Sequence, residues 1–200
     1  MIPSKIYPLR TNEKRKSNKF IILSHISNFS IRLDPMKPDL RGYLPYYTMS
    51  QLSTYYRETL EWNTIPFHYH MNKINGDWEV HVSESLEAKS DMLTKAISAG
   101  YVDPFFRDAI VIAIQDDYNG RIPEIRTYEV AASRIIAPLN KIMKLGTFRD
   151  TVFWYDEIFN IGQYEADFKE DRHSLKYPYS VSPMKYFDRV QFNIETRRFV

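Results

Sequence analysis

Three of the five histidines in the sequence lie within residues 65–82, which read IPFHYHMNKINGDWEVHV. His68 and His70 precede an Asn-Gly pair, and His81 follows it. Asn-Gly is the strongest short-range signal for a two-residue hairpin turn, and such a turn places His70 opposite His81. Side chains alternate along a strand, so His68 and His70 share one face. The three imidazoles can therefore cluster, and neutral imidazoles are zinc ligands.

Two interpretations of this histidine cluster remain open at the level of sequence. The favoured one is a packed or surface role in the fold, and the other is an independent metal site. Nothing nearby supplies an obvious fourth ligand. The chain has no cysteine, which excludes thiolate ligands and disulfides and is compatible with a reducing compartment.

The composition is that of a globular protein with one domain and some additional segments. The 200 residues are 44% hydrophobic and 15% aromatic, with only six glycines. Fifteen tyrosines exceed what a core of this size needs, so we expect some of them on a partner surface. The sequence has neither an apolar run of membrane-spanning length nor a signal peptide, and we expect cytoplasmic synthesis and no membrane partner.

Basic residues gather near the N-terminus, although the net charge of the whole chain is only +2. Residues 5–19 contain one acid, Glu13, and six bases: Lys5, Arg10, Lys14, Arg15, Lys16 and Lys19. The favoured interpretation is a solvated basic arm over residues 1–18, and the alternative is contact with an acidic partner or with phosphates. Nucleic-acid binding is the least favoured role because the total charge is so small.

Hydrophobic periodicity predicts an α/β fold with a central mixed β-sheet flanked by helices. A buried strand is expected at 19–27, a central strand buried on both faces at 108–114, and another strand at 151–158. Helices are expected at 48–62, within 83–99 as far as Gly100, and at 125–143, where Pro138 is a candidate kink or break. The stretch 159–200 has no clear pattern.

This order of elements resembles the zinc-dependent N-acetylmuramoyl-L-alanine amidases of the phage lysozyme type and their relatives, the peptidoglycan recognition proteins. The resemblance covers residues 19–168. The family's first strand ends in His-x-Ser/Thr, as does IILSHIS here, and its Tyr-His hairpin resembles PFHYHMNKINGDWEVHV. Its central strand, following helix and His-x-Asp/Glu-Ile strand resemble DAIVIAI, IRTYEVAASRI and WYDEI.

The resemblance implies a zinc site with three protein ligands and an open position. His25 matches the first ligand, the second falls on Tyr155, and Asp167 is the candidate for the third. The family's catalytic tyrosine falls on Phe67, and a histidine that lines its site falls on Ile97. A neutral tyrosine is a poor zinc ligand, and phenylalanine has no hydroxyl to stabilise an oxyanion. The resemblance thus implies a degenerate site in which only His25 and Asp167 are candidate metal ligands.

The leading hypothesis is a catalytically degenerate amidase-fold protein that serves as a structural or interaction component of a larger assembly, such as a phage virion. It would need no cofactor. The predicted organisation is a basic arm (1–18), an amidase-like domain (19–168) and an aromatic C-terminal extension (169–200), with the arm and extension contacting other chains. The alternatives are an active zinc amidase and a non-catalytic peptidoglycan binder. His25 itself has two interpretations, a hydrogen-bonded histidine at the sheet end and a surviving metal ligand.

Overall fold

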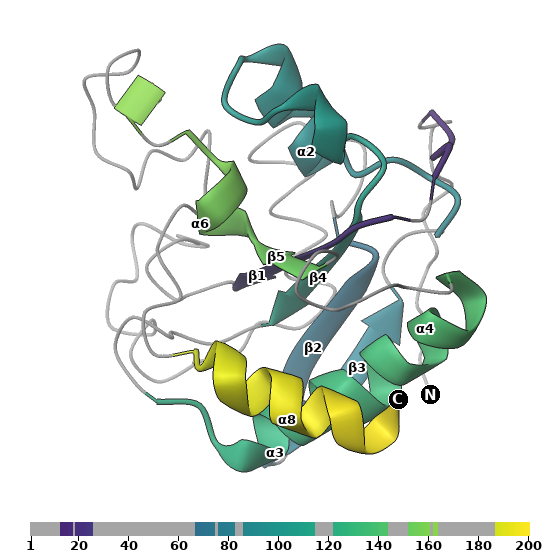
Figure 1. Cartoon of the computed structure of the whole chain (residues 1–200), viewed down its shortest axis with the longest axis vertical. Coiled ribbons are helices and arrows are strands. Elements are labelled where there is room, and N and C mark those ends of the chain that lie inside the picture. The colour runs from purple at the N-terminus through teal and green to yellow at the C-terminus, as the bar shows by residue number, and fades with distance from the viewer. Residues whose placement is uncertain are drawn as a thin grey trace.

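The computed structural model describes residues 13–17, 19–25, 67–74, 76–82, 86–114, 122–143, 152–160, 162–163 and 187–200. The helix predicted at 48–62 and the candidate ligand Asp167 lie outside these residues. The described part contains a five-stranded sheet in the order β3-β2-β4-β1-β5 (Figure 1). Its strands are β1 (Ile21–His25), β2 (Tyr69–Ile74), β3 (Asp77–Val82), β4 (Ile110–Ile114) and β5 (Val152–Trp154).

The mixed sheet predicted from sequence is confirmed. The β2–β3 hairpin is antiparallel, whereas β2, β4, β1 and β5 run parallel to one another. Every residue of β4 is buried, as its continuous apolar run predicts for a central strand covered on both faces. The hairpin register pairs Ile74 with Asp77 and His70 with His81, as the Asn-Gly turn predicts. Gly76 at this turn has a φ of 85°, which glycine adopts without strain.

Helices cover both faces of the sheet (Figure 1). One face carries α2 (Asp91–Ser98) and α6 (Tyr155–Ile158). The other carries a helical segment made of α3 (Ile125–Val130), η4 (Ala131–Ile136) and α4 (Ala137–Met143), together with α8 (Arg189–Phe199). A short 3₁₀ turn, η3 (Pro104–Phe106), precedes β4. Among the described residues, no helix is long and apolar enough to cross a membrane.

The helix predicted at 125–143 forms, but Pro138 does not break it. The segment changes instead from α-helical to π-helical over η4 and returns to α-helical at Ala137. A proline ring clashes with the carbonyl of the residue four positions earlier, here Arg134, and it is tolerated in the first turn of a helix. The π-helical stretch before Pro138 places the proline in such a first turn, so the chain continues without a break.

The strand predicted at 151–158 is shorter than expected. It ends at Trp154, and α6 begins at Tyr155. Glu157 reaches back so that its Oε2 accepts a hydrogen bond from the Trp154 backbone N–H at 3.0 Å, which satisfies a donor at the helix start. The sequence contains this signal, a glutamate three residues after the position that precedes the helix. The apolar run in front of it predicts a strand through the same residues, and the glutamate cap ends that strand at Trp154.

The C-terminal residues 187–200 are part of the core of the domain. Phe187 and Phe192 are 4% and 1% exposed, and both contact the Trp154 ring, with centroid distances of 5.2 and 5.7 Å. At the start of α8, Asp188 Oδ1 accepts hydrogen bonds from the next turn as an N-cap. Arg189 forms an ion pair with Glu157 and places its guanidinium 4.8 Å from the Trp154 ring centroid. α8 and the residues before it therefore cover the Trp154 side chain of β5 on the α3 side of the sheet.

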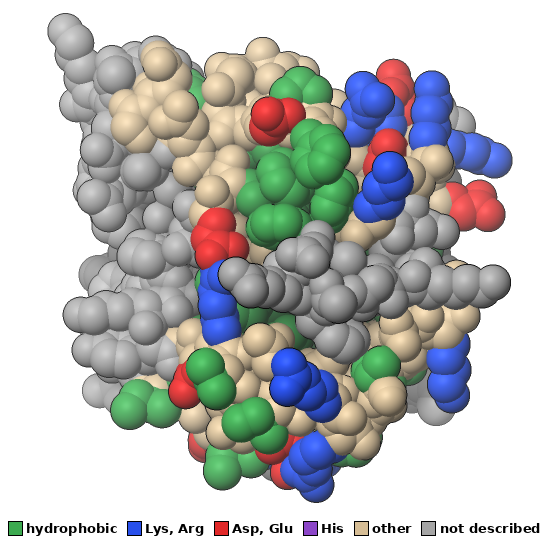
Figure 2. Space-filling view, in the orientation of Figure 1, with side chains coloured by type: hydrophobic (Ala, Val, Ile, Leu, Met, Phe, Trp, Pro, Cys, Tyr) green, Lys and Arg blue, Asp and Glu red, His purple; other side chains and the backbone are tan. Residues whose placement is uncertain are grey.

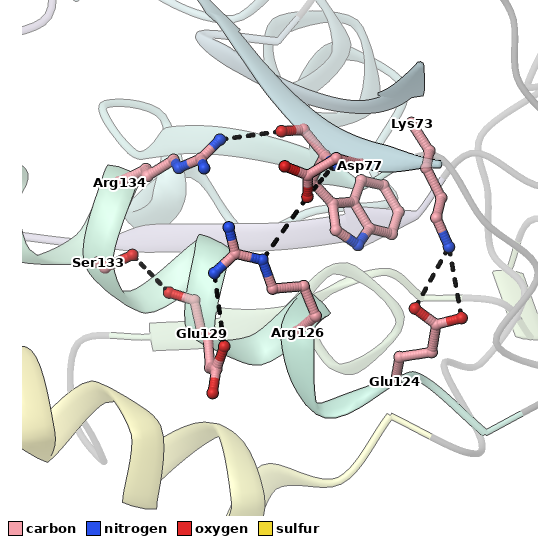
Figure 3. A network of polar contacts seen from close by, with 8 residues as sticks. Lys73, Asp77, Glu124, Arg126, Glu129, Ser133 and Arg134 are labelled. Atoms are coloured by element: carbon pink, nitrogen blue, oxygen red, sulfur yellow. Dashed lines mark hydrogen bonds and ion pairs between the residues drawn. The ribbon is translucent and has the colours of Figure 1, made fainter. Parts of the chain in front are cut away.

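Polar contacts join the hairpin to the helical segment that begins at α3 (Figure 3). Asp77 lies 3.6 Å from Arg126, and Arg134 donates a hydrogen bond to the Trp78 carbonyl at 2.9 Å. The Trp78 N–H, which donates to Asp77, is the main reason that the pKa of this carboxyl lies below its usual value. The same view shows two further pairs, Lys73 with Glu124 and Arg126 with Glu129. Arg134 thus satisfies a carbonyl of the edge strand β3 that would otherwise be open to another chain.

Replacing Phe192 by alanine is expected to lower the free energy of unfolding by about 3–5 kcal/mol, because it leaves a cavity in the core. The matched control is Val190→Ala on the same helix, whose side chain is 67% exposed. The control should change stability by less than about 0.5 kcal/mol. Urea denaturation of both variants measures the difference, and equal stabilities would show that α8 is not packed as described.

Candidate functional site

The candidate site from the resemblance lies where parallel strands end. β1 ends at His25 and β5 ends at Trp154, and the two strands are neighbours with Leu23 paired to Trp154. The backbones of His25 and Tyr155 therefore come to the same edge of the sheet, although these residues are far apart in sequence. Asp167, the third candidate ligand, is outside the described residues, and only the backbone of His25 is described.

The three positions predicted as vestigial come together in one apolar cluster. Phe67 and Tyr155 are 0% and 1% exposed and belong to the core between the sheet and α2, with Ile97 packed against it. Their neighbours are apolar or aromatic: Ile22, Met92, Leu93, Ala96, Tyr101, Val102, Ala109, Val111, Ala113 and Phe159. The Tyr155 and Phe159 ring centroids are 5.4 Å apart. At these three positions, where the resemblance expects a reactive centre, the sheet and α2 hold a packed apolar core.

These side chains do not fit a zinc centre at this point. A buried phenol replaces the second expected ligand, and zinc in proteins is held by histidine, cysteine or carboxylate. At Phe67 no hydroxyl is available to stabilise developing negative charge. Among the described residues, no group of three His, Asp or Glu side chains could hold a metal ion. The cluster buries apolar surface and excludes water. The side chains of Phe67 and Ile97 contain no group that can accept or donate a proton.

Phe67 enters this cluster because the chain bends just before β2. Strand alternation predicts that Phe67, Tyr69 and Met71 share a face, and Tyr69 and Met71 do pack together on the α3 side. Phe67 precedes the first residue of β2 and packs on the opposite, α2 side. The period-two rule applies only within a regular strand, so the prediction for Phe67 was wrong.

His68 forms a bridge between the central strand and the loop before α2. Its Nδ1 accepts the Val111 backbone N–H at 2.9 Å, and its own backbone N–H donates to the Val111 carbonyl at 2.9 Å. Because Nδ1 is an acceptor, the proton is on Nε2, which lies 2.7 Å from the Ala88 carbonyl and donates to it. Both ring nitrogens are used within the fold, which leaves neither for a metal. Burial lowers the pKa of His68 from 6.5 to about 4.

The other two hairpin histidines stack on each other across the strands. The His70 and His81 ring centroids are 6.3 Å apart with an interplanar angle of 29°. His70 is fully buried, and His81 is 3.4 Å from Glu79. The predicted clustering of all three histidines therefore holds for this pair only, since His68 is bonded to Val111 and Ala88.

The basic arm is partly docked on the loop that His68 contacts. Lys14 forms an isolated antiparallel bridge with Ala88, next to backbone hydrogen bonds of 2.7 and 2.8 Å. The half-buried Arg15 guanidinium donates to the carbonyls of Leu86, Ser17 and Asp108. The charge pattern predicts a solvated arm, whereas Arg15 is half-buried. Nothing in the sequence alone distinguishes Arg15 from its neighbours, because its role depends on carbonyls about 70 and 90 residues away.

The free energy of unfolding is expected to fall by roughly 3 kcal/mol as the pH drops from 6.5 to 4, through His68 alone. The unfolded chain binds a proton near pH 6.5, whereas folded His68 binds one only near pH 4. Stability is therefore full above pH 6.5 and is lost as the pH falls through this window. Urea denaturation across the window measures the loss.

The variant His68→Gln tests the assignment of this pH dependence to His68. The difference in unfolding free energy between wild type and variant should shrink steadily as the pH falls from 6.5 to 4. His81→Gln, which alters a histidine outside the bridge, is the matched control and should keep the acid loss of the wild type. An unchanged acid loss in His68→Gln would show that other groups cause it.

No protein family and no curated protein sequence matches this chain. Its fold is similar to that of solved peptidoglycan recognition proteins. Drosophila peptidoglycan recognition protein SD aligns with a TM-score of 0.51 and 13% identity, over 74% of this chain and 75% of that one. A complex of tracheal cytotoxin with the ectodomains of peptidoglycan recognition proteins LCa and LCx aligns with a TM-score of 0.50 and 10% identity, over 83% and 92%. The chain thus has the amidase-like α/β fold expected from its sequence.

Proposed function

We propose that this protein recognises peptidoglycan without hydrolysing it. The observation that carries the proposal is the burial of Phe67 and Tyr155 in one apolar cluster, at the positions where the resemblance expects a catalytic tyrosine and a zinc ligand. The fold supports peptidoglycan as the ligand, because a structurally similar complex contains tracheal cytotoxin bound to peptidoglycan recognition proteins. A fold of this kind that lacks the reactive groups can still bind the ligand.

A second candidate function is a structural component of a larger assembly, such as a phage virion. The resemblance to phage lysozyme-type amidases motivates the setting, and the exposed side chain of Phe105, in the turn η3 before β4, supports contact with other chains. The segments first expected to make such contacts are partly engaged within the domain. Residues 13–17 bond to the loop before α2, and residues 187–200 pack beneath β5.

We expect purified protein to sediment with peptidoglycan sacculi and to release no peptide from them, with or without added zinc. Chitin, which is a related glycan without stem peptides, is the control ligand and should retain less protein. Co-sedimentation and an assay for newly exposed amino groups measure binding and cleavage separately. Absence of binding to sacculi would remove the peptidoglycan proposal and leave the assembly candidate.

The variant Phe67→Tyr tests the catalytic half of the same proposal. It supplies the hydroxyl that the resemblance expects, in an apolar site where an unpaired hydroxyl costs about 1–3 kcal/mol. We expect lower stability and still no amidase activity. Stoichiometric zinc that is lost in His25→Ala, together with peptide release from sacculi, would show that the protein is an enzyme.

A further inference from the structure

Four phenylalanines form a cluster at the surface, and three of them pack against the apolar cluster that contains Phe67 and Tyr155. Phe20 precedes β1, Phe105 and Phe106 form η3 before β4, and Phe153 lies in the edge strand β5. Their rings touch in a continuous set, with centroid distances of 4.8 Å for Phe20–Phe105, 5.5 Å for Phe20–Phe106 and 5.2 Å for Phe106–Phe153. We name this set the phenylalanine cluster.

The phenylalanine cluster is only partly covered by the rest of the molecule. Phe105 is 64% exposed, and the other three rings are half-buried. Figure 2 shows a continuous hydrophobic patch on this face, between α2 and β5 as Figure 1 places them. Aromatic side chains in a continuous exposed patch are costly in water and mark interaction surfaces. The inner half-buried rings also hold Phe105 in place, so a partner would meet an ordered surface.

The charges beside Phe105 indicate which partner fits. Asp103 lies two residues before it and Arg107 two residues after it, and both residues are exposed. Arg107 Nε also lies 3.8 Å from Asp108 Oδ2 of the same chain, and its side chain remains 62% exposed and open to a partner. Asp103 Oδ1 accepts the Phe105 backbone N–H at 2.8 Å, which fixes this turn with the ring outward. A uniformly acidic partner would be repelled by Asp103, and a uniformly basic one by Arg107. The surface is complementary to one that carries the same two charges in reversed order.

We propose that the protein self-associates through the phenylalanine cluster, with a second copy of this chain as the occupant. In a two-fold contact centred on Phe105, the two copies of the ring meet and the flanking charges pair crosswise. Asp103 of each copy then faces Arg107 of the other, because a two-fold axis reverses the direction of the chain. This contact uses neither residues 1–18 nor residues 169–200.

Sedimentation velocity over a wide range of protein concentrations tests the proposal. The wild type is expected to shift from monomer to dimer, and Phe105→Ser should weaken association by roughly tenfold or more, as expected for a central aromatic anchor. Ile142→Ser is the matched control, because Ile142 is also 64% exposed and lies on α4, away from the cluster. A wild type that stays monomeric, or a dimer that Phe105→Ser leaves intact, overturns the proposal.

A charge-removal series tests the crosswise pairing. Asp103→Asn keeps the Oδ1 acceptor for the Phe105 N–H and removes the charge, and Arg107→Gln removes the opposite charge. Each single variant should weaken the dimer, and the double variant D103N/R107Q should weaken it little further, because the pair is already lost in either single variant. Circular dichroism confirms that each variant is folded. Losses that simply add in the double variant would show that Asp103 and Arg107 do not pair across the contact, and they would overturn the two-fold arrangement.

Discussion

Burial of β4 on both faces is the constraint that organises the described part of the molecule. Each of its five residues is inaccessible to water, so a layer of side chains must cover the sheet above and below. Helix α2 with α6 provides one layer, and the α3-to-α4 segment with α8 provides the other. The two layers divide the side chains of the sheet by strict alternation: Ile22 faces α2, whereas Ile21 and Leu23 face α3.

The α2 layer of the core is built from packed apolar and aromatic side chains. In the resemblance this layer carries a hydroxyl, an imidazole and a metal ligand, all of which need water or partners and so weaken a core. Here Phe67, Ile97 and Tyr155 contribute area to the same layer. Burying an aliphatic or aromatic side chain contributes about 1.5–3 kcal/mol. Under the proposal of binding without hydrolysis, this exchange of polar for apolar side chains stabilises the fold, because active sites are sites of compromised packing.

Sequence reasoning predicted those features that depend on neighbours along the chain. The apolar run and the Asn-Gly turn are local signals: the first predicted β4 as a buried central strand, and the second predicted the hairpin and its register. It failed where a contact with a residue distant in the sequence determines the role of a side chain. The imidazole of His68 finds both its partners, Val111 and Ala88, beyond its own hairpin. A histidine read as a potential ligand is thereby a structural bridge, which no pattern within residues 65–82 can show.

The aromatic residues also show that composition does not predict which side chains are exposed. The excess of tyrosine indicated that tyrosines serve a partner, yet the four that the structure describes are buried or half-buried, namely Tyr69, Tyr101, Tyr128 and Tyr155. Tyr128 uses its hydroxyl inside the fold, accepting the Asp188 N–H at 2.9 Å. Phe105, which has no polar group to satisfy, is exposed instead. Exposing a phenylalanine ring to water is unfavourable. The position of Phe105 is therefore better explained by an apolar contact with a partner than by solubility.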